Sequence, residues 1–86
     1  MEYTDQMKNR LKRVEGQLRG VLKMMEDGED CRDVVSQLAA SRTAIDRTMG
    51  VIVSENLVEC VQKAIEDGED TKDYVDQAVN LLVKSR

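Results

Sequence analysis

The fold is decided by residues 31–66, which read CRDVVSQLAASRTAIDRTMGVIVSENLVECVQKAIE. The chain contains no proline, and this stretch is rich in residues that favour helices, so it predicts one helix of about 35 residues. The pentapeptide Glu-Asp-Gly-Glu-Asp stands on both sides of it, at residues 26–30 and 66–70. In each copy the glycine ends one helix and the last aspartate begins the next. The sequence therefore predicts three helices, with the longest in the middle.

The apolar residues of each predicted helix recur at spacings of three and four, which is typical of packed helices. The first helix begins after Thr4 or Asp5 and ends near Glu26, and the third covers about 71–84. Residues 1–86 are thus expected to form a single all-α domain, whose small core favours oligomerisation. The predicted apolar stripes are Met7, Leu11, Val14, Leu18, Val21 and Met25; Val35, Leu38, Ile45, Met49 and Ile52; and Val75, Ala78, Val79 and Leu82.

The only two cysteines, Cys31 and Cys60, both fall in the central helix. Their spacing leaves them about 20° apart around the axis, on one face of the helix. Along the axis they are roughly 43 Å apart, whereas a disulfide needs Cα atoms within about 7 Å. A continuous helix therefore excludes a bond within one chain. In an antiparallel pair of these helices centred near residues 45–46, Cys31 of one protomer would lie beside Cys60 of the other, at two equivalent sites per dimer.

The residues alone leave three roles open for the cysteines. Each can be a small buried hydrophobic residue in a helix interface. Two thiolates from two chains can bind a soft metal such as Cu(I), but the chain has no histidine, and one turn before Cys60 stands Asn56, a poor ligand. A pair of thiols that exchanges sulfur needs no third ligand. Without histidine, and with 2% aromatic residues, the chain is not expected to be an enzyme.

Basic side chains concentrate near the N-terminus, although the net charge is −4. Residues 1–25 carry six basic and three acidic side chains, whereas residues 26–86 carry seven and fourteen. At helical spacing Gln6, Arg10, Arg13 and Gln17 form one polar stripe beside the apolar seam. Such side chains hydrogen-bond to phosphates and base edges, so the stripe is either a DNA contact or an ordinary exposed face. No leader or membrane segment is visible, and we expect a cytoplasmic protein.

Several stretches of the sequence together resemble a known family. They are NRLKRVEGQLRG at 9–20, Cys31, QLAASRTAI at 37–45 and SENLVEC at 54–60. These residues are similar to the copper-sensitive operon repressor (CsoR/RcnR-type) family of bacterial DNA-binding repressors. The resemblance implies an antiparallel helical dimer that pairs into a flat dimer-of-dimers tetramer. It also implies that double-stranded operator DNA is released when an inducer reacts between protomers, and that the DNA contacts include Arg10, Arg13, Gln17 and, as a further candidate, Arg42.

The position of Asn56 indicates the branch of the family. Copper members have a histidine there and bind Cu(I) through Cys, His and Cys, formaldehyde-responsive members typically share that histidine, and nickel and cobalt members need several histidines. Two cysteines with a non-ligand between them resemble the persulfide-sensing branch, the CsoR-like sulfurtransferase repressors. That resemblance implies no cofactor or metal, persulfide or polysulfide inducers, and control of sulfide-detoxification genes through di- or polysulfide links between Cys31 and Cys60. A Cu(I)-responsive repressor of the same fold and a non-DNA helical interaction module are the alternatives.

Overall fold

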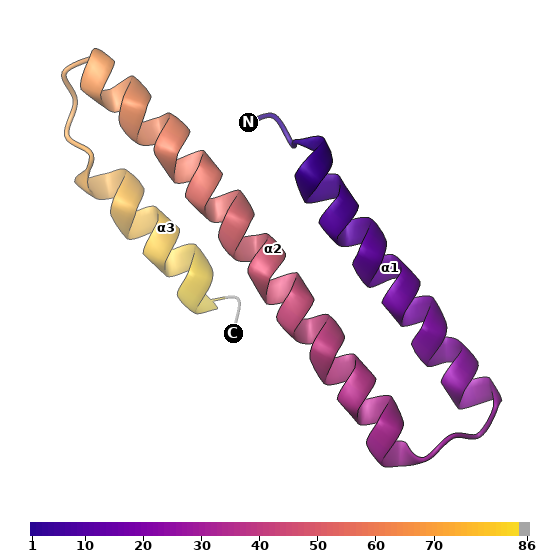
Figure 1. Ribbon diagram of the computed structural model, residues 1–86. Coiled ribbons are helices and arrows are strands. Elements are labelled where there is room, and N and C mark those ends of the chain that lie inside the picture. The colour runs from indigo at the N-terminus through magenta and orange to yellow at the C-terminus, as the bar shows by residue number, and fades with distance from the viewer. Residues whose placement is uncertain (85–86) are drawn as a thin grey trace. The chain divides into compact units, whose positions relative to one another are not determined.

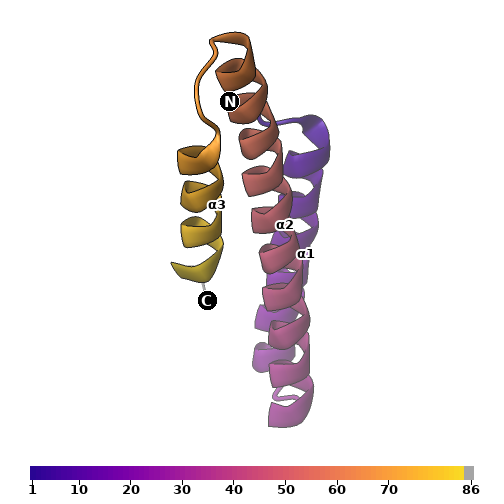
Figure 2. The ribbon, with the colours of Figure 1, turned by 90° about the vertical axis from the view of Figure 1, so that its left-hand side faces the viewer.

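The computed structural model describes residues 1–84 and contains three helices, α1 (Asp5–Glu26), α2 (Cys31–Glu66) and α3 (Lys72–Lys84) (Figure 1). No strand occurs in residues 1–84. With 36 residues, α2 is much the longest helix, and it is unbroken in both views (Figures 1 and 2). The all-α prediction with a long central helix is confirmed, and each predicted helix boundary lies within about one residue of the observed one.

The chain forms two compact units that share α2. One unit is Thr4–Thr48, which contains α1 and the first half of α2. The other consists of Met1–Tyr3 and the chain from Met49 onward, which contains the second half of α2 and α3. The expectation of a single domain over 1–86 stays a prediction, and its residues 85–86 lie outside the described part of the chain.

The repeated pentapeptide forms the same structure at both helix ends. Gly28 and Gly68 have φ angles of 69° and 71°, in the left-handed region that favours glycine. At the first end the N–H of Gly28 donates to the carbonyl of Met25 at 3.1 Å, and the N–H of Glu29 donates to that of Met24 at 3.0 Å. This is the Schellman arrangement, and equivalent bonds of 3.2 and 2.8 Å occur at the second end. The sequence repeat is therefore a repeated helix stop.

Side-chain caps then start the helices. At α1, Thr4 Oγ1 accepts a hydrogen bond from the N–H of Met7 at 3.2 Å. Asp30 and Asp70 each accept from the N–H two residues further on, at 3.0 Å before α2 and 3.1 Å before α3. Each cap satisfies an N–H group that has no partner inside its helix.

The Thr4–Thr48 unit is an antiparallel pair of helices with a narrow core. From α1, Met7, Val14 and Val21 are buried, with 3–5% of their surface exposed. From α2, Ser41 and Thr48 are buried to 2% and 3%. All five residues lie at seven-residue intervals on their helices, so the core is one seam of heptad layers. Small polar side chains on α2 face larger apolar ones on α1.

The predicted apolar stripes are only partly buried within a single chain. On α1 only every second predicted residue is buried, since Leu11, Leu18 and Met25 are 40–53% exposed. The predicted stripe on the first half of α2 is also exposed: Val35 to 57%, Leu38 to 38% and Ile45 to 37%. On α3, Ala78 is buried, whereas the other predicted residues, Val75, Val79 and Leu82, are exposed. The face of α2 that packs against α1 is therefore not the face that carries the predicted apolar stripe. Among the described residues, no helix has the length and apolar character needed to cross a membrane.

Candidate nucleic-acid interface and thiol sites

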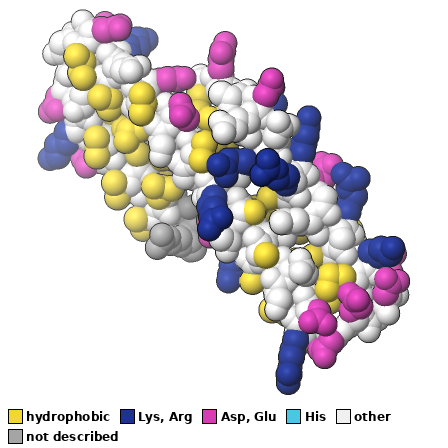
Figure 3. Space-filling view, viewed as in Figure 1, with side chains coloured by type: hydrophobic (Ala, Val, Ile, Leu, Met, Phe, Trp, Pro, Cys, Tyr) yellow, Lys and Arg dark blue, Asp and Glu magenta, His cyan; other side chains and the backbone are white. Residues whose placement is uncertain are grey.

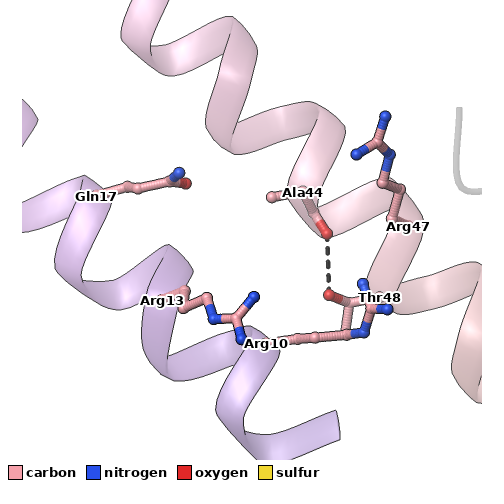
Figure 4. Close-up of a pocket in the computed structure, with 6 residues that line it drawn as sticks. All are labelled: Arg10, Arg13, Gln17, Ala44, Arg47 and Thr48. Carbon is pink, nitrogen blue, oxygen red and sulfur yellow. Dashed lines mark hydrogen bonds between the residues drawn. The ribbon is translucent and has the colours of Figure 1, made fainter. Parts of the chain in front are cut away.

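Three of the residues predicted to contact DNA meet on the surface of the Thr4–Thr48 unit. Arg10, Arg13 and Gln17 extend from α1 toward α2 (Figure 4). There they line a hollow of about 190 Å³ together with residues of α2. We call this the basic hollow, and its lining residues are Arg10, Arg13, Gln17, Ala44, Arg47 and Thr48.

Hydrogen bonds fix the floor of the basic hollow. Thr48 Oγ1 donates to the carbonyl of Ala44 at 2.9 Å (Figure 4). The Ser41 hydroxyl lies 3.1 Å from the carbonyl of Gln37 and 3.4 Å from Oε1 of Gln17. Bonds from serine and threonine back to their own helix are local, but the contact with Gln17 joins the two helices. The N–H groups of the Gln17 amide take no part in this contact.

Positive charge is concentrated where the basic hollow lies. Its lining contains three arginines and no carboxylate. On the face of the molecule that Figure 3 shows, dark-blue Lys and Arg side chains gather near the middle. The Thr4–Thr48 unit carries nine basic and eight acidic side chains, whereas the other unit carries four basic and nine acidic. A DNA phosphate would therefore be attracted to the first unit and repelled by the second.

Sequence reasoning missed Arg47. Arg47 lies on α2, whereas all the residues of the predicted stripe lie on α1. The loop at Gly28 makes α1 and α2 antiparallel, so residues at equal distances from that loop lie level with one another. Counting outward from the loop would have paired Arg10 with Arg47. The predicted candidate Arg42 is exposed and is not among the residues that line the basic hollow, nor is Gln6.

The two cysteines have different surroundings. Cys31 is the first residue of α2 and is exposed. Cys60 is half-buried near the other end of α2, and its sulfur lies 4.0 Å from Oδ1 of Asn56, in position to donate a weak hydrogen bond. Both thiols are free. Because α2 is unbroken between them, Cys31 and Cys60 of one chain cannot form a disulfide with each other.

The residues around Cys60 do not suit a three-ligand site for a soft metal. Asn56 offers an amide oxygen, a ligand type preferred by hard cations rather than by Cu(I). Within residues 1–84 no three histidine, cysteine, aspartate or glutamate side chains gather in one chain as a metal site. The chain supplies two thiolates and no imidazole, so any soft-metal site between protomers would have to rely on the sulfurs.

A second hollow, of about 220 Å³, lies in the other unit and is almost wholly apolar. It is lined by Met49, Ile52, Val53, Leu81 and Leu82. None of these side chains can bind an anion or transfer a proton. This hollow therefore offers no polar site of its own.

Solved structures with this fold are regulators. The nickel-responsive transcriptional regulator InrS superposes with a TM-score of 0.83 at 31% identity, covering 94% of this chain and 93% of its own. The copper-sensing repressor CsoR with Cu(I) from Geobacillus thermodenitrificans gives a TM-score of 0.77 at 30% identity, covering 98% and 91%. These neighbours agree with the all-α architecture of three helices.

Curated relatives point the same way. Bacillus subtilis YrkD, an uncharacterized protein, is 67% identical over 63 residues, which are 73% of this chain and all of that protein. The copper-sensing transcriptional repressor RicR of Mycobacterium tuberculosis is 40% identical over 69% of this chain, and CsoR of Bacillus subtilis is 37% identical over 66%. The matches span 65% of RicR and 56% of CsoR, so just over half to two thirds of these repressors' length is covered.

A family model also matches nearly the whole chain. Its description is "Metal-sensitive transcriptional repressor", and it covers residues 3–84. Members of this family are repressors and not enzymes, which agrees with the expectation from the residues, and membership favours a repressor over a non-DNA interaction module. The chain belongs to the CsoR-type family of metal-sensitive transcriptional repressors.

Proposed function

We propose that this repressor responds to persulfides and polysulfides rather than to a metal, and that Cys31 and Cys60 of different protomers are its sensor. The observation that carries the proposal is the residue beside Cys60. Asn56 stands one turn away with its amide oxygen 4.0 Å from the sulfur, in a chain without histidine. Two thiols suffice for sulfur exchange, whereas the Asn56 amide adds no third soft ligand for Cu(I).

The proposed chemistry needs no added oxidant. One thiolate attacks the outer sulfur of a persulfide R–S–SH, which gives a cysteine persulfide and releases RS⁻. The second thiolate then attacks the inner sulfur of that persulfide, which forms a disulfide and releases HS⁻. If both cysteines carry a persulfide, the terminal sulfur of one persulfide attacks the inner sulfur of the other. This attack forms a trisulfide between the two cysteines and releases HS⁻. In each case the persulfide sulfur accepts the two electrons that the bond formation yields.

The proposed assembly brings the thiols together between chains. The stripe of Val35, Leu38 and Ile45 follows Cys31 along α2, and these side chains are 37–57% exposed. An antiparallel α2 pair, and a tetramer made of two such pairs, would bury it. In that arrangement Cys31 faces the Cys60 of a second protomer. The proposal includes a cytoplasmic location, because thiols are kept reduced there and would be available for the sensor.

The proposed DNA surface contains Arg10, Arg13 and Gln17, with Arg42 as a further candidate on α2. Guanidinium groups bind phosphate oxygens in a fixed geometry, and the basic hollow holds three of them without a neutralising carboxylate in its lining. Cross-linking α2 to α2 at both ends would lock the register of the helix pair and shift these arginines from the spacing of the phosphates. We expect the cross-linked protein to lose operator affinity, and equal affinity of the reduced and cross-linked forms would refute this coupling.

Response to Cu(I) is the second candidate function. It is favoured by the relatives RicR and CsoR, both copper-sensing repressors, which share 37–40% identity with the matched parts of this chain. Two thiolates from two protomers would be the metal's soft ligands in this case. The persulfide proposal ranks first because it uses the residues present without requiring a third ligand.

One pair of measurements separates the two candidates. Reduced protein is treated with a persulfide donor and analysed by intact mass spectrometry without reductant, and the same protein is titrated with Cu(I) against a chelator of known affinity. We expect cross-linked dimers that contain the disulfide or additional whole sulfur atoms, and only weak Cu(I) binding. Cys60→Ser is the matched control and should remain monomeric on denaturing gels. Unchanged thiols after the donor, together with tight stoichiometric Cu(I) binding, would favour the copper function.

A further inference from the structure

The basic hollow has the composition of an anion site. Three of its six lining residues are arginines, and Gln17 adds an amide. Thr48 is buried to 3% and Arg10 is half-buried, so part of the floor is withdrawn from solvent. The volume of about 190 Å³ holds several water molecules, since one water needs about 10–15 Å³ of such space. An ion of a few heavy atoms can therefore enter together with part of its hydration shell.

Side chains that can donate hydrogen bonds line this hollow. The Ala44 carbonyl accepts from Thr48 Oγ1, and the Gln17 oxygen lies 3.4 Å from the Ser41 hydroxyl. The Gln17 N–H groups and the guanidinium N–H groups remain as donors. Within residues 1–84 none of the three arginines forms an ion pair, in contrast to Arg19, which binds Glu15 at 2.7 Å.

No carboxylate of residues 1–84 lines the hollow beside these arginines. Asp46 precedes Arg47 in sequence but points about 100° away around α2 and does not line the hollow. Like charges that share a hollow repel one another, so a bound anion would relieve repulsion as well as accept hydrogen bonds. Guanidinium groups are planar donors that match two oxygens of a phosphate or sulfate at once.

We propose that the basic hollow binds one free tetrahedral oxyanion, of the class of inorganic phosphate or sulfate, in the absence of DNA. Four oxygens and a charge near −2 suit planar guanidinium donors better than a spherical chloride does. In Figure 4 the Arg47 guanidinium is directed away from Arg13 and Gln17, so it would have to turn toward a bound ion. A DNA phosphodiester offers the same chemistry from a second source, so the free ion and the operator compete for the hollow. Binding of the free ion does not depend on the proposed DNA contact or on the persulfide response.

The first experiment uses the reduced full-length protein without DNA. Amide NMR spectra are recorded during titration with sodium phosphate and with sodium sulfate, and sodium chloride at matched ionic strength serves as the reference. We expect saturable shifts of the Gln17 side-chain amide and of the backbone amides of Ala44 and Thr48, with little response to chloride. Shifts that are equal for all three salts, or that do not saturate, would overturn the proposal.

Arg47→Gln tests the location. Arg47 is exposed and forms no ion pair within residues 1–84, so the variant should keep its helical content. Removing a charged hydrogen-bond donor should weaken oxyanion binding about tenfold. Arg32→Gln is the matched control, because Arg32 is exposed on the same helix and lies outside the hollow, and the oxyanion affinity of this variant should stay within twofold of the unmodified protein. Equal losses in both variants would show a diffuse charge effect and overturn the site.

A competition experiment then distinguishes the two sources of the oxyanion. Operator binding is measured by fluorescence anisotropy in phosphate and in chloride buffers of equal ionic strength. A larger loss in phosphate, abolished by Arg47→Gln, is the expected result and links the hollow to the DNA backbone. Saturable phosphate binding without such competition would retain the oxyanion site and refute the DNA contact at this hollow. Operator competition that persists unchanged in Arg47→Gln would place the anion elsewhere and overturn the site.

Discussion

Replacing Arg13 with glutamine should change the salt dependence of operator binding by a calculable amount. Each phosphate that a protein neutralises contributes about 0.9 to the slope of log affinity against log salt. Arg13 lies in the basic hollow without a carboxylate partner, so its charge is available to a phosphate. If two protomers contact the operator through Arg13, the slope should become shallower by about 1.8. Between 50 and 200 mM salt the variant would then lose about 12-fold less affinity than the unmodified protein.

The assay is fluorescence anisotropy with a labelled promoter fragment at five salt concentrations, on reduced protein. Arg19→Gln is the control, because Arg19 is on the same helix and carries the same charge but is 72% exposed and paired with Glu15. Its slope should stay close to that of the unmodified protein. The reasoning is refuted if Arg13→Gln leaves the slope unchanged, or if Arg19→Gln reduces it as much.

Three further predictions concern the sensor and the fold. Asn56→His adds an imidazole one turn before Cys60 and should tighten Cu(I) binding in a chelator competition; unchanged affinity would show that residue 56 does not face the sulfur site. Val14→Ala removes two methyl groups from a side chain that is 5% exposed and should lower the free energy of unfolding in urea by about 2 kcal/mol; a loss below about 0.5 kcal/mol would contradict the assigned core. Gly28→Ala places a Cβ on a residue with φ of 69° and should lower the free energy of unfolding by about 1–2 kcal/mol in thermal unfolding. Gly50→Ala is the control, because its added Cβ would meet no atom within 4 Å in this chain, and it should not destabilise the protomer. Similar destabilisation by both substitutions would argue against the role of Gly28 in the cap.

The element boundaries were predictable because each depends on a few neighbouring residues. Thr4 and Asp30 cap helices through bonds to N–H groups two or three residues away. Gly28 and Gly68 end helices because they adopt a conformation that other residues disfavour. The stripe of Arg10, Arg13 and Gln17 was also visible, since residues three and four apart share a helix face.

Burial was not predictable in the same way. Met7, Leu11 and Val14 are equally apolar and similarly spaced, yet Leu11 is 50% exposed while the other two are buried. Heptad spacing shows which residues share a stripe, but the register of a second helix decides which part of the stripe is covered. On α2 the covered face carries Ser41 and Thr48, whose hydroxyls are satisfied by the carbonyls of their own helix. A search for apolar residues would not select that face.

The sequence by itself determined the three helices, their ends, the pair of thiols, the absence of histidine and the basic stripe on α1, because these follow from residue identity and local spacing. Only the tertiary structure decided that Arg47 of α2 joins that stripe around a hollow. It also decided that the apolar stripe beginning after Cys31 is left uncovered by α1. The physical reason is that the antiparallel packing of α1 on α2 fixes which side chains meet, and packing depends on residues distant in sequence.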